Sequence, residues 1–323
     1  MDCPRITGFT EEAKEFLDRW NDSSEYITVH TSGSTGSPKN IHLLKSDMKI
    51  SAKATNDFFG INSSSQLALP LSISYIAGKM MVVRSIMADC NLHIVSPGLD
   101  PLKGLPENIR FNLIPIVPAQ IPGLLSHINL QDRLENIIVG GAPTTANQEK
   151  LLSAIGVPVY ATYGMTETSS HVALRKIGLD DFYTALPGIE FGVDERSCLI
   201  IRSEAASYIE LVTNDCVSLI SPTRFQWLGR ADNVINTGGI KIYPEEIEKK
   251  LSPLINNRAF YISSRASEKW GSEIILYVEG KDFDKEMFMA KAINYIDRKF
   301  IPKDIIAVER LERTKNGKII RRK

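Results

Sequence analysis

The chain has 323 residues, of which 38 are basic and 38 are acidic, so its formal net charge at pH 7 is zero. This length allows a large core and two domains, and the charge balance gives no electrostatic case for nucleic acid or an anionic membrane as the main partner. The 4 cysteines and 5 histidines are scattered, without the spacing of a zinc site or a Ser-His-Asp triad.

The N-terminal sequence Met-Asp-Cys-Pro-Arg lacks the charged and then apolar pattern of a signal peptide. No uninterrupted apolar run approaches the roughly 20 residues that a membrane helix needs. These two features predict a soluble, cytoplasmic protein with reduced cysteines.

A loop without large apolar side chains, Thr31–Lys39, follows a β-branched run at 26–30 that predicts a strand. A helical pattern begins at about Leu44, so we expect a strand-to-helix loop. Its glycines allow close backbone approach, and its hydroxyls and lysine suit a polyphosphate, although a flexible surface loop has the same composition. Pro38 before the lysine excludes a Walker A loop. The candidate phosphate ligands are Thr31, Ser32, Gly33, Ser34, Thr35, Gly36 and Lys39.

Strand and helix patterns then alternate along the chain. We expect strands over 66–71, 92–96, 112–117, 137–139 and 157–162, and helices over 76–88 and 144–155. This alternation predicts an α/β fold with mostly parallel, layered sheets. Strand follows strand from Cys198 to Ile220, which predicts an added small β subdomain.

The pattern changes again near Gly229. A Gly238-Gly239 turn and a helix that opens at Pro244, with two glutamates in its first turn, indicate a separate compact unit. We therefore expect a large N-terminal domain over 1–230 and a small α+β C-terminal domain over 231–323.

Five motifs occur in register along the chain: Thr31–Lys39, Gly140–Pro143, Tyr163–Thr168, Gly229–Glu248 and Arg313–Arg322. Together they resemble the adenylate-forming superfamily of acyl- and aryl-CoA synthetases, peptide-synthetase adenylation domains and luciferases. The resemblance implies an acid-thiol ligase that uses ATP, Mg²⁺ and CoA with a small carboxylic acid.

The resemblance also implies roles for single residues. The loop would hold the β- and γ-phosphates, Tyr163 would lie against the adenine, and Asp215 would accept the ribose hydroxyls. Thr166 would bind the α-phosphate, and Glu167 would help to hold Mg²⁺, which prefers oxygen ligands. The other expected nucleotide contacts are Gly140, Gly141, Ala142, Pro143 and Arg230.

The last motifs belong to the expected mobile domain. Lys318 resembles the catalytic lysine of adenylation, and Asp232 matches the hinge residue. Gly238 and Gly239 would leave room for the pantetheine arm of CoA.

The acid substrate is suggested by the segment 69–84, which is similar to the corresponding stretch of o-succinylbenzoate-CoA ligases of menaquinone biosynthesis. In that comparison Tyr75 and Gly78 line the acid pocket, and Arg84 meets the second carboxylate of the substrate. Tyr75 replaces a histidine, two extra residues separate Pro70 from Gly78, and only thirty residues precede the loop. These departures fit a trimmed member that acts on a compact aryl acid.

Three alternatives remain open at this point. The enzyme could activate another aryl acid, or it could load a carrier protein instead of CoA. A non-catalytic, nucleotide-binding regulator belongs to a different class. A dehydrogenase is disfavoured because no Gly-x-Gly-x-x-Gly follows a strand.

Overall fold

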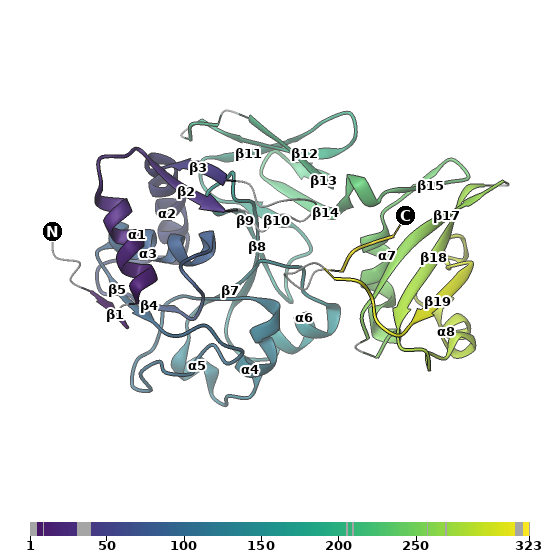
Figure 1. The fold of residues 1–323 in the computed structure, drawn as a ribbon, viewed down its shortest axis with the longest axis horizontal. Helices are drawn as coiled ribbons and strands as arrows, with labels where there is room; N and C mark the ends of the chain where they lie inside the picture. The colour runs from purple at the N-terminus through teal and green to yellow at the C-terminus, as the bar shows by residue number, and fades with distance from the viewer. Residues whose placement is uncertain are drawn as a thin grey trace.

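The computed structural model describes residues 5–8, 10–30, 40–204, 206–208, 210–256, 258–268, 270–313 and 319–322. The elements up to β14 form a larger body, and the elements from β15 onward form a smaller one beside it (Figure 1). Among the described helices, none combines the length and the apolar character needed to span a bilayer.

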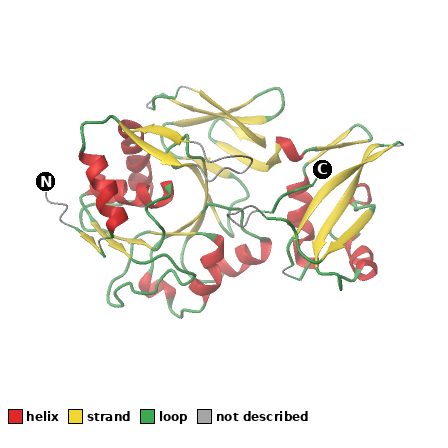
Figure 2. Ribbon diagram, in the orientation of Figure 1, coloured by secondary structure: helices red, strands yellow, loops and turns green. Residues whose placement is uncertain are grey.

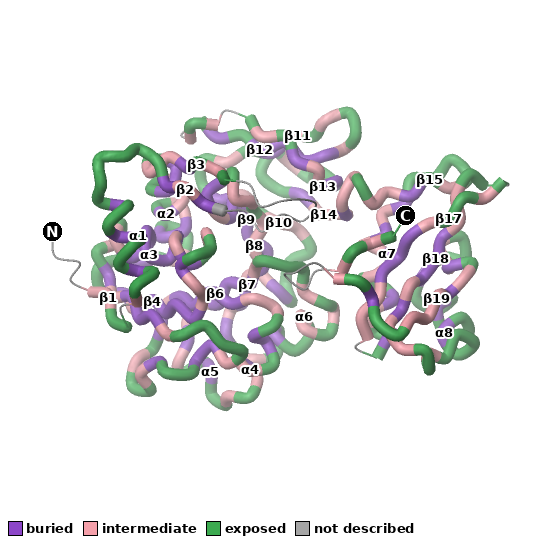
Figure 3. The backbone as a smooth tube through the Cα atoms, viewed as in Figure 1, coloured by how far each residue is buried: buried purple, intermediate pink, exposed green. Residues whose placement is uncertain are grey.

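The first part of the chain builds helices around a small parallel sheet in the order β1-β5-β4. Buried Phe16, Met48 and Met81 from its three helices share one core with buried strand residues. Figure 2 shows the helices and strands of this part, and Figure 3 shows which stretches of the backbone are buried. The elements are β1 (Ile6–Thr7), α1 (Glu11–Asn21), β2 (Tyr26–His30), β3 (Asn40–Leu44), α2 (Lys45–Phe59), β4 (Gln66–Leu69), α3 (Ile76–Ala88) and β5 (Asn91–Ile94).

The expected strand-to-helix connection over 31–39 is wrong. β2 pairs with β3 in antiparallel fashion, from Tyr26 opposite Leu44 to His30 opposite Asn40, so the loop lies between two strands of a hairpin. The five-residue strand β3 runs directly into α2, and its apolar residues merge with the helical pattern in the sequence. Residues 31–39 themselves lie outside the described part of the chain.

A nine-stranded sheet dominates the larger body, in the order β11-β12-β13-β14-β10-β9-β8-β7-β6. Pairing is parallel between β6, β7 and β8, and antiparallel from β8 to β11. The strands are β6 (Ile114–Ile116), β7 (Ile137–Val139), β8 (Val159–Gly164), β9 (His171–Lys176), β10 (Tyr183–Ala185), β11 (Ile189–Val193), β12 (Cys198–Ser203), β13 (Glu210–Ser221) and β14 (Arg224–Arg230).

The α/β class is therefore confirmed, with two qualifications. Parallel pairing holds in the small sheet and at one end of the large sheet, whereas the remaining strands of the large sheet are antiparallel. The expected β subdomain continues that same sheet. Short helices pack beside its parallel end: α4 (Ile121–Leu125), α5 (Leu130–Arg133), α6 (Ala146–Leu152) and the 3₁₀ helix η1 (Pro118–Gln120).

The smaller body has its own hydrophobic core, centred on buried residues such as Leu251, Leu276 and Phe288. In its three-stranded sheet β18 lies between β17 and β19. The elements are η2 (Ala231–Asn233), β15 (Ile235–Thr237), β16 (Ile240–Ile242), α7 (Pro244–Leu251), η3 (Ser252–Leu254), β17 (Phe260–Ser267), β18 (Gly271–Glu279), α8 (Lys285–Ala292), η4 (Arg298–Phe300) and β19 (Asp304–Val308). The expected helix start at Pro244 is confirmed. The domain boundary near residue 231 stays a prediction.

Candidate functional site

The carboxyl ends of β7 and β8 lie side by side, at the kind of sheet edge where α/β proteins bind ligands. Gly140 follows β7, and its N–H donates to the carbonyl of Ile116 at 3.1 Å. A Cβ atom at this position would lie 2.3 Å from Oγ1 of Thr162 on β8, so only glycine fits. The predicted Gly140–Pro143 segment therefore begins next to the end of β8, with residues 141–143 exposed.

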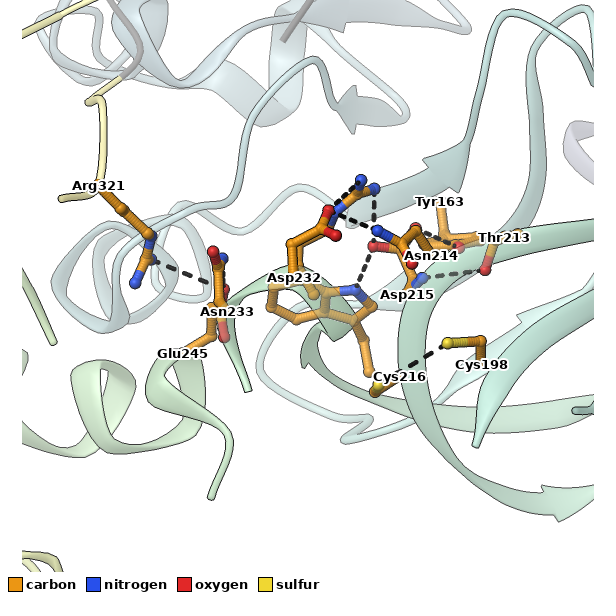
Figure 4. Close-up of polar contacts among 12 residues, drawn as sticks. Tyr163, Cys198, Thr213, Asn214, Asp215, Cys216, Asp232, Asn233, Glu245 and Arg321 are labelled. Carbon is orange, nitrogen blue, oxygen red and sulfur yellow. Dashed lines mark hydrogen bonds and ion pairs between the residues drawn. The ribbon is translucent and has the colours of Figure 1, made fainter. Parts of the chain in front are cut away.

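Tyr163, near the end of β8, connects this edge to the antiparallel part of the sheet. Its hydroxyl donates to Oδ2 of Asp215 on β13 at 2.8 Å (Figure 4). Its ring packs edge-on against Phe225, with centroids 5.0 Å apart. Burial, and then the charge of Asp215, raise the pKa of Tyr163 above its ordinary value, so the phenol stays protonated and acts as a donor.

Asp215 collects several donors in one place. Arg230 Nη1 lies 3.4 Å from its Oδ1, and Trp227 Nε1 donates to the same oxygen at 3.3 Å. The structure therefore brings together the predicted residues Tyr163, Asp215 and Arg230. Trp227 was missed, because it lies outside every motif and only strand pairing brings it to the carboxylate.

The predicted phosphate and magnesium residues lie in the turn between β8 and β9. Gly164, the last residue of β8, begins this turn. A Cβ atom on Gly164 would lie 2.3 Å from the carbonyl oxygen of Ser170. Inside it, the Thr166 carbonyl accepts from Ser169 N at 2.9 Å, while Glu167 is exposed. The turn thus holds Thr166 at the carboxyl end of β8 and presents a carboxylate beside it.

Arg84 is the most unusual charged residue of the larger body. It sits on α3 with only 2% of its surface exposed. Its Nη2 donates to Oγ of Ser170 at 2.7 Å, and its Nε has no hydrogen-bond partner among the residues that the structure describes. Burial lowers the pKa of Arg84 to about 9, and no described carboxylate forms an ion pair with it.

His171 lies next to this cation in the same buried region. Its Nε2 is 3.1 Å from Oγ1 of Thr55, and its Nδ1 is 3.3 Å from Oγ of Ser170. Burial, and then the positive charge of Arg84, lower the pKa of His171 well below its ordinary value. The imidazole is therefore neutral at pH 7, and the pair carries one positive charge.

The start of α3 carries Tyr75 and Gly78, the two residues that were predicted to line the acid pocket. Tyr75 is the N-cap residue of α3 and is 59% exposed. Gly78 packs so closely against the preceding turn that a Cβ would lie 2.3 Å from the carbonyl of Ser72. The same helix carries Tyr75 and Gly78 in its first turn and Arg84 two turns further on.

The predicted hinge residue Asp232 lies where the two bodies meet. Its carboxylate is 3.6 Å from Arg230 Nη2 and accepts from the side-chain amide of Asn214 (Figure 4). The two predicted glycines, Gly238 and Gly239, form the turn between β15 and β16 with φ of 54° and 78°. Both have the left-handed backbone that favours glycine.

Two predicted elements cannot be placed. The loop Thr31–Lys39 and Lys318 both lie outside the described residues. Within the described ranges, no group of three or more His, Cys, Asp or Glu side chains is arranged to hold a metal ion. A magnesium ion that arrives on a nucleotide needs only one or two protein carboxylates, and exposed Glu167 fits that requirement.

Comparisons with known proteins show a matching family model and similar solved structures. A family model described as AMP-binding enzyme matches residues 9–192. The solved acyl-CoA synthetase (AMP-forming)/AMP-acid ligase II-like protein from Dyadobacter fermentans is 33% identical, with a TM-score of 0.65, covering 99% of this chain and 94% of that one.

Two further similarities involve proteins with a named substrate. The o-succinylbenzoate CoA synthetase of Bacillus subtilis, solved with its acyl-adenylate intermediate, shares the fold with a TM-score of 0.79 at 20% identity, over 90% of this chain and 67% of that one. The 2-succinylbenzoate–CoA ligase of Listeria monocytogenes is 24% identical over 96% of this chain and 71% of its own length.

Proposed function

Because the chain belongs to the AMP-binding enzyme family, we propose that it is an ATP-dependent o-succinylbenzoate-CoA ligase. The observation that carries the substrate assignment is Arg84, a buried cation without a described carboxylate partner. A substrate with a second carboxylate, besides the one that reacts, supplies the missing anion. The names of the relatives from Bacillus subtilis and Listeria monocytogenes support the same substrate.

The reaction has two steps. The carboxylate of the acid attacks the α-phosphate of ATP, and an acyl-adenylate forms as pyrophosphate leaves. The thiol of CoA then attacks the acyl carbon, and the thioester forms as AMP leaves. Two anions must meet in the first step, so positive charge placed at the phosphate lowers its barrier.

The nucleotide pocket is assigned to the edge formed by β7, β8 and β13. Asp215 accepts the ribose hydroxyls, and Tyr163 and Arg230 hold its carboxylate in place. The backbone of Gly140–Pro143 and the Tyr163 ring offer two surfaces that suit a flat base. Thr166 lies at the end of the same strand, where the α-phosphate would follow the ribose.

Charge neutralisation is assigned to Lys318 and to a magnesium ion held by Glu167. The ion would supply positive charge to the phosphate oxygens. The loop Thr31–Lys39 would bind the β- and γ-phosphates and release them as pyrophosphate. CoA would approach the Gly238-Gly239 turn.

Arg84 and Ser170 form the distal end of the acid pocket in this proposal. A guanidinium removed from water gains more from a carboxylate than an exposed guanidinium does, because little solvent competes for it. Neutral His171 beside it can donate a hydrogen bond without adding a second charge. This environment favours a dianionic aryl acid over benzoate or a fatty acid.

The test is a CoA-thioester assay with o-succinylbenzoate, benzoate, 4-hydroxybenzoate and medium-chain fatty acids. We expect o-succinylbenzoate to be preferred, and Arg84→Ala to reduce its kcat/KM by about 10²-fold, as for loss of a buried charged hydrogen-bond partner. Turnover of benzoate should change little. Arg110→Ala, at an exposed position, is the control and should leave all activities unchanged.

Equal loss for benzoate and o-succinylbenzoate in the Arg84→Ala enzyme would contradict the substrate assignment. Thioester formation with a carrier protein but not with free CoA would instead indicate a carrier-loading enzyme. Release of pyrophosphate with none of these acids would contradict the proposed reaction.

A further inference from the structure

A bidentate ion pair joins the C-terminal segment 319–322 to α7. Arg321 Nη1 and Nη2 donate to Oε1 and Oε2 of Glu248 at 2.6 and 2.7 Å. The same carboxylate accepts the backbone N–H of Ile262 at 2.6 Å, and Arg321 Nη1 also reaches the carbonyl of Ile262 at 3.2 Å. The side chains of Arg321 and Glu248 are only 25% and 15% exposed, so water competes weakly with this bidentate pair.

The segment is also fixed at its upstream end. Arg313 pairs with Ile319 in an antiparallel bridge, and the N–H of Ile320 donates to the carbonyl of Glu312 at 2.8 Å. Arg313 makes a second fork, with Glu279 on β18, at 2.7 and 3.0 Å. The chain therefore enters and leaves the stretch 314–318 at two positions held by arginine–carboxylate pairs.

Side chains on α7 connect the Arg321–Glu248 ion pair to the predicted hinge. Glu245 lies one turn before Glu248 on this helix, and its Oε1 is 3.7 Å from Arg321 Nη2. That oxygen also accepts from Nδ2 of Asn233, which follows the predicted hinge residue Asp232 (Figure 4). Within the described ranges Glu245 Oε2 has no hydrogen-bond partner, and a Cβ atom built on Gly229 would lie 2.3 Å from it.

The predicted hinge residue Asp232 also connects to the proposed nucleotide pocket. Asp232 is paired with Arg230, which in turn contacts Asp215. Two sets of polar contacts, Arg321–Glu245–Asn233 and Asp232–Arg230–Asp215, therefore meet at the adjacent residues Asn233 and Asp232 (Figure 4). Adjacency alone does not establish coupling, so a direct energetic test is needed.

We propose that Arg321 is a positioning residue for adenylation: it holds the segment that carries Lys318 on α7 and, through Glu245, at the hinge. This inference rests on the proposed function, in which Lys318 acts at the α-phosphate. Without Arg321 the downstream end keeps the hydrogen bonds of Arg322 with Tyr261 and Ser263 but loses its charged fork. A misplacement of the catalytic group by about 1 Å can cost 10²-fold in rate. Arg321 itself touches no reacting atom.

The test measures the two half-reactions separately: pyrophosphate release with o-succinylbenzoate and ATP, and thioester formation from supplied acyl-adenylate and CoA. Arg321→Gln should slow adenylate formation by about tenfold or more while thioester formation stays within about twofold. Arg321→Lys, which restores the charge but not the fork, should recover part of the loss.

A matched control is present in the same body. Arg258 makes a similar fork with Asp282, at 2.8 and 2.9 Å, and its Nη1 lies 3.4 Å from the carbonyl of Glu279; none of its hydrogen bonds within the described ranges reaches 319–322. Arg258→Gln should leave both half-reactions unchanged. Equal loss of both half-reactions in the Arg321→Gln enzyme, or a loss in the Arg258→Gln enzyme of the same size and pattern, would show a structural role and overturn the inference.

A double-mutant cycle distinguishes the positioning role of Arg321 from the proposed role of Lys318 in adenylation. Lys318→Ala should slow adenylation to a small, measurable residual rate and spare thioester formation, and adding Arg321→Gln to it should cause no further loss. An additive loss overturns the role of Arg321 alone. A Lys318→Ala enzyme that still forms adenylate at the normal rate contradicts the proposed function and the inference with it.

Glu245→Gln provides a second variant in case Arg321→Gln does not fold. It retains the side-chain shape and the Glu248 fork but removes the charge that joins Arg321 to Asn233. The same selective loss in adenylation, smaller in size, is expected. An adenylation rate equal to that of the unaltered enzyme contradicts the link to the hinge.

Discussion

Arg84 shows how much a single side chain can reveal about a substrate. Its buried guanidinium donates one short hydrogen bond to Ser170, and its Nε has no partner in the described part of the chain. Such a charge destabilises the unliganded fold, so its presence suggests a compensating role in binding. The contact with Ser170 joins α3 to the turn that follows β8, and no local sequence pattern could have predicted that pairing.

Tyr163 gives a second prediction at the residue scale. Tyr163→Phe removes the hydrogen bond of 2.8 Å to Asp215 and leaves the packing of the ring in place. A bond to a charged group is worth about 1.5–3 kcal/mol, so we expect KM for ATP to rise roughly tenfold or more, with a smaller effect on kcat.

Steady-state kinetics with varied ATP measure this effect. Tyr160→Phe, on the same strand, is the control and should leave KM for ATP unchanged. An unchanged KM in the Tyr163→Phe enzyme would contradict the placement of the nucleotide beside Asp215.

The elements that the sequence predicted well are those with a strong local pattern. α3 and β7 have the predicted bounds, and α2 begins one residue later than expected. The hairpin between β2 and β3 was missed because the short strand β3 adjoins α2 without a turn signal. The antiparallel continuation of the large sheet was missed because the pairing of β10 with β14 joins distant segments.

The residues of the candidate site differ in the same way: some were predicted from local motifs, and others depend on contacts between distant segments. Motifs predicted Tyr163, Asp215 and Arg230, which the structure brings into contact. Trp227, Glu245 and Arg321 became visible only through strand pairing and helix packing. These contacts depend on three-dimensional register, which single-sequence patterns do not encode.

At the element scale, α1 braces the turn that leads into α3. Glu12 Oε2 accepts from the hydroxyl of Ser72 at 2.9 Å and from the N–H of Ile73 at 3.1 Å. From the other side, Lys79 Nζ donates to the carbonyls of Ile73 and Ser74. This turn lies between Pro70 and Gly78, the interval in which the sequence has two extra residues.

Glu12→Gln should therefore loosen the wall of the acid pocket. We expect KM for o-succinylbenzoate to rise by about two- to fivefold, in line with about 0.5–1 kcal/mol for a weakened exposed contact, while KM for ATP stays constant. Glu11→Gln, at the neighbouring exposed position, is the control. Equal changes in both KM values would indicate a general loss of structure instead.

At the scale of the whole molecule, acid should act on the smaller body through Glu279. The hydrogen bond from Arg313, more than any other contact, lowers the pKa of Glu279 from 4.5 to about 2. A carboxyl group with a lowered folded pKa contributes stability above its unfolded pKa and loses it as pH falls through the folded value. The contribution of this pair is therefore lost between about pH 4.5 and pH 2.

Urea unfolding between pH 7 and pH 2.5 tests this expectation. The Glu279→Gln protein should be less stable than the unaltered protein at pH 7, and the difference should shrink as the pH falls toward 2.5. Glu309→Gln, at an exposed position, is the control. A difference that does not depend on pH would show that the charge of Glu279 contributes nothing.

The order of strands in the large sheet also has a consequence for how the chain folds during synthesis. β10 lies between β9 and β14, and Tyr183 pairs with Phe225. The parallel end of the sheet can assemble from segments that are close in sequence, but β10 lacks one neighbour until β14 has left the ribosome. Such distant pairing slows folding and leaves a strand edge open meanwhile. A ribosome that pauses before residue 224 would therefore hold a nascent chain with an exposed, aggregation-prone edge.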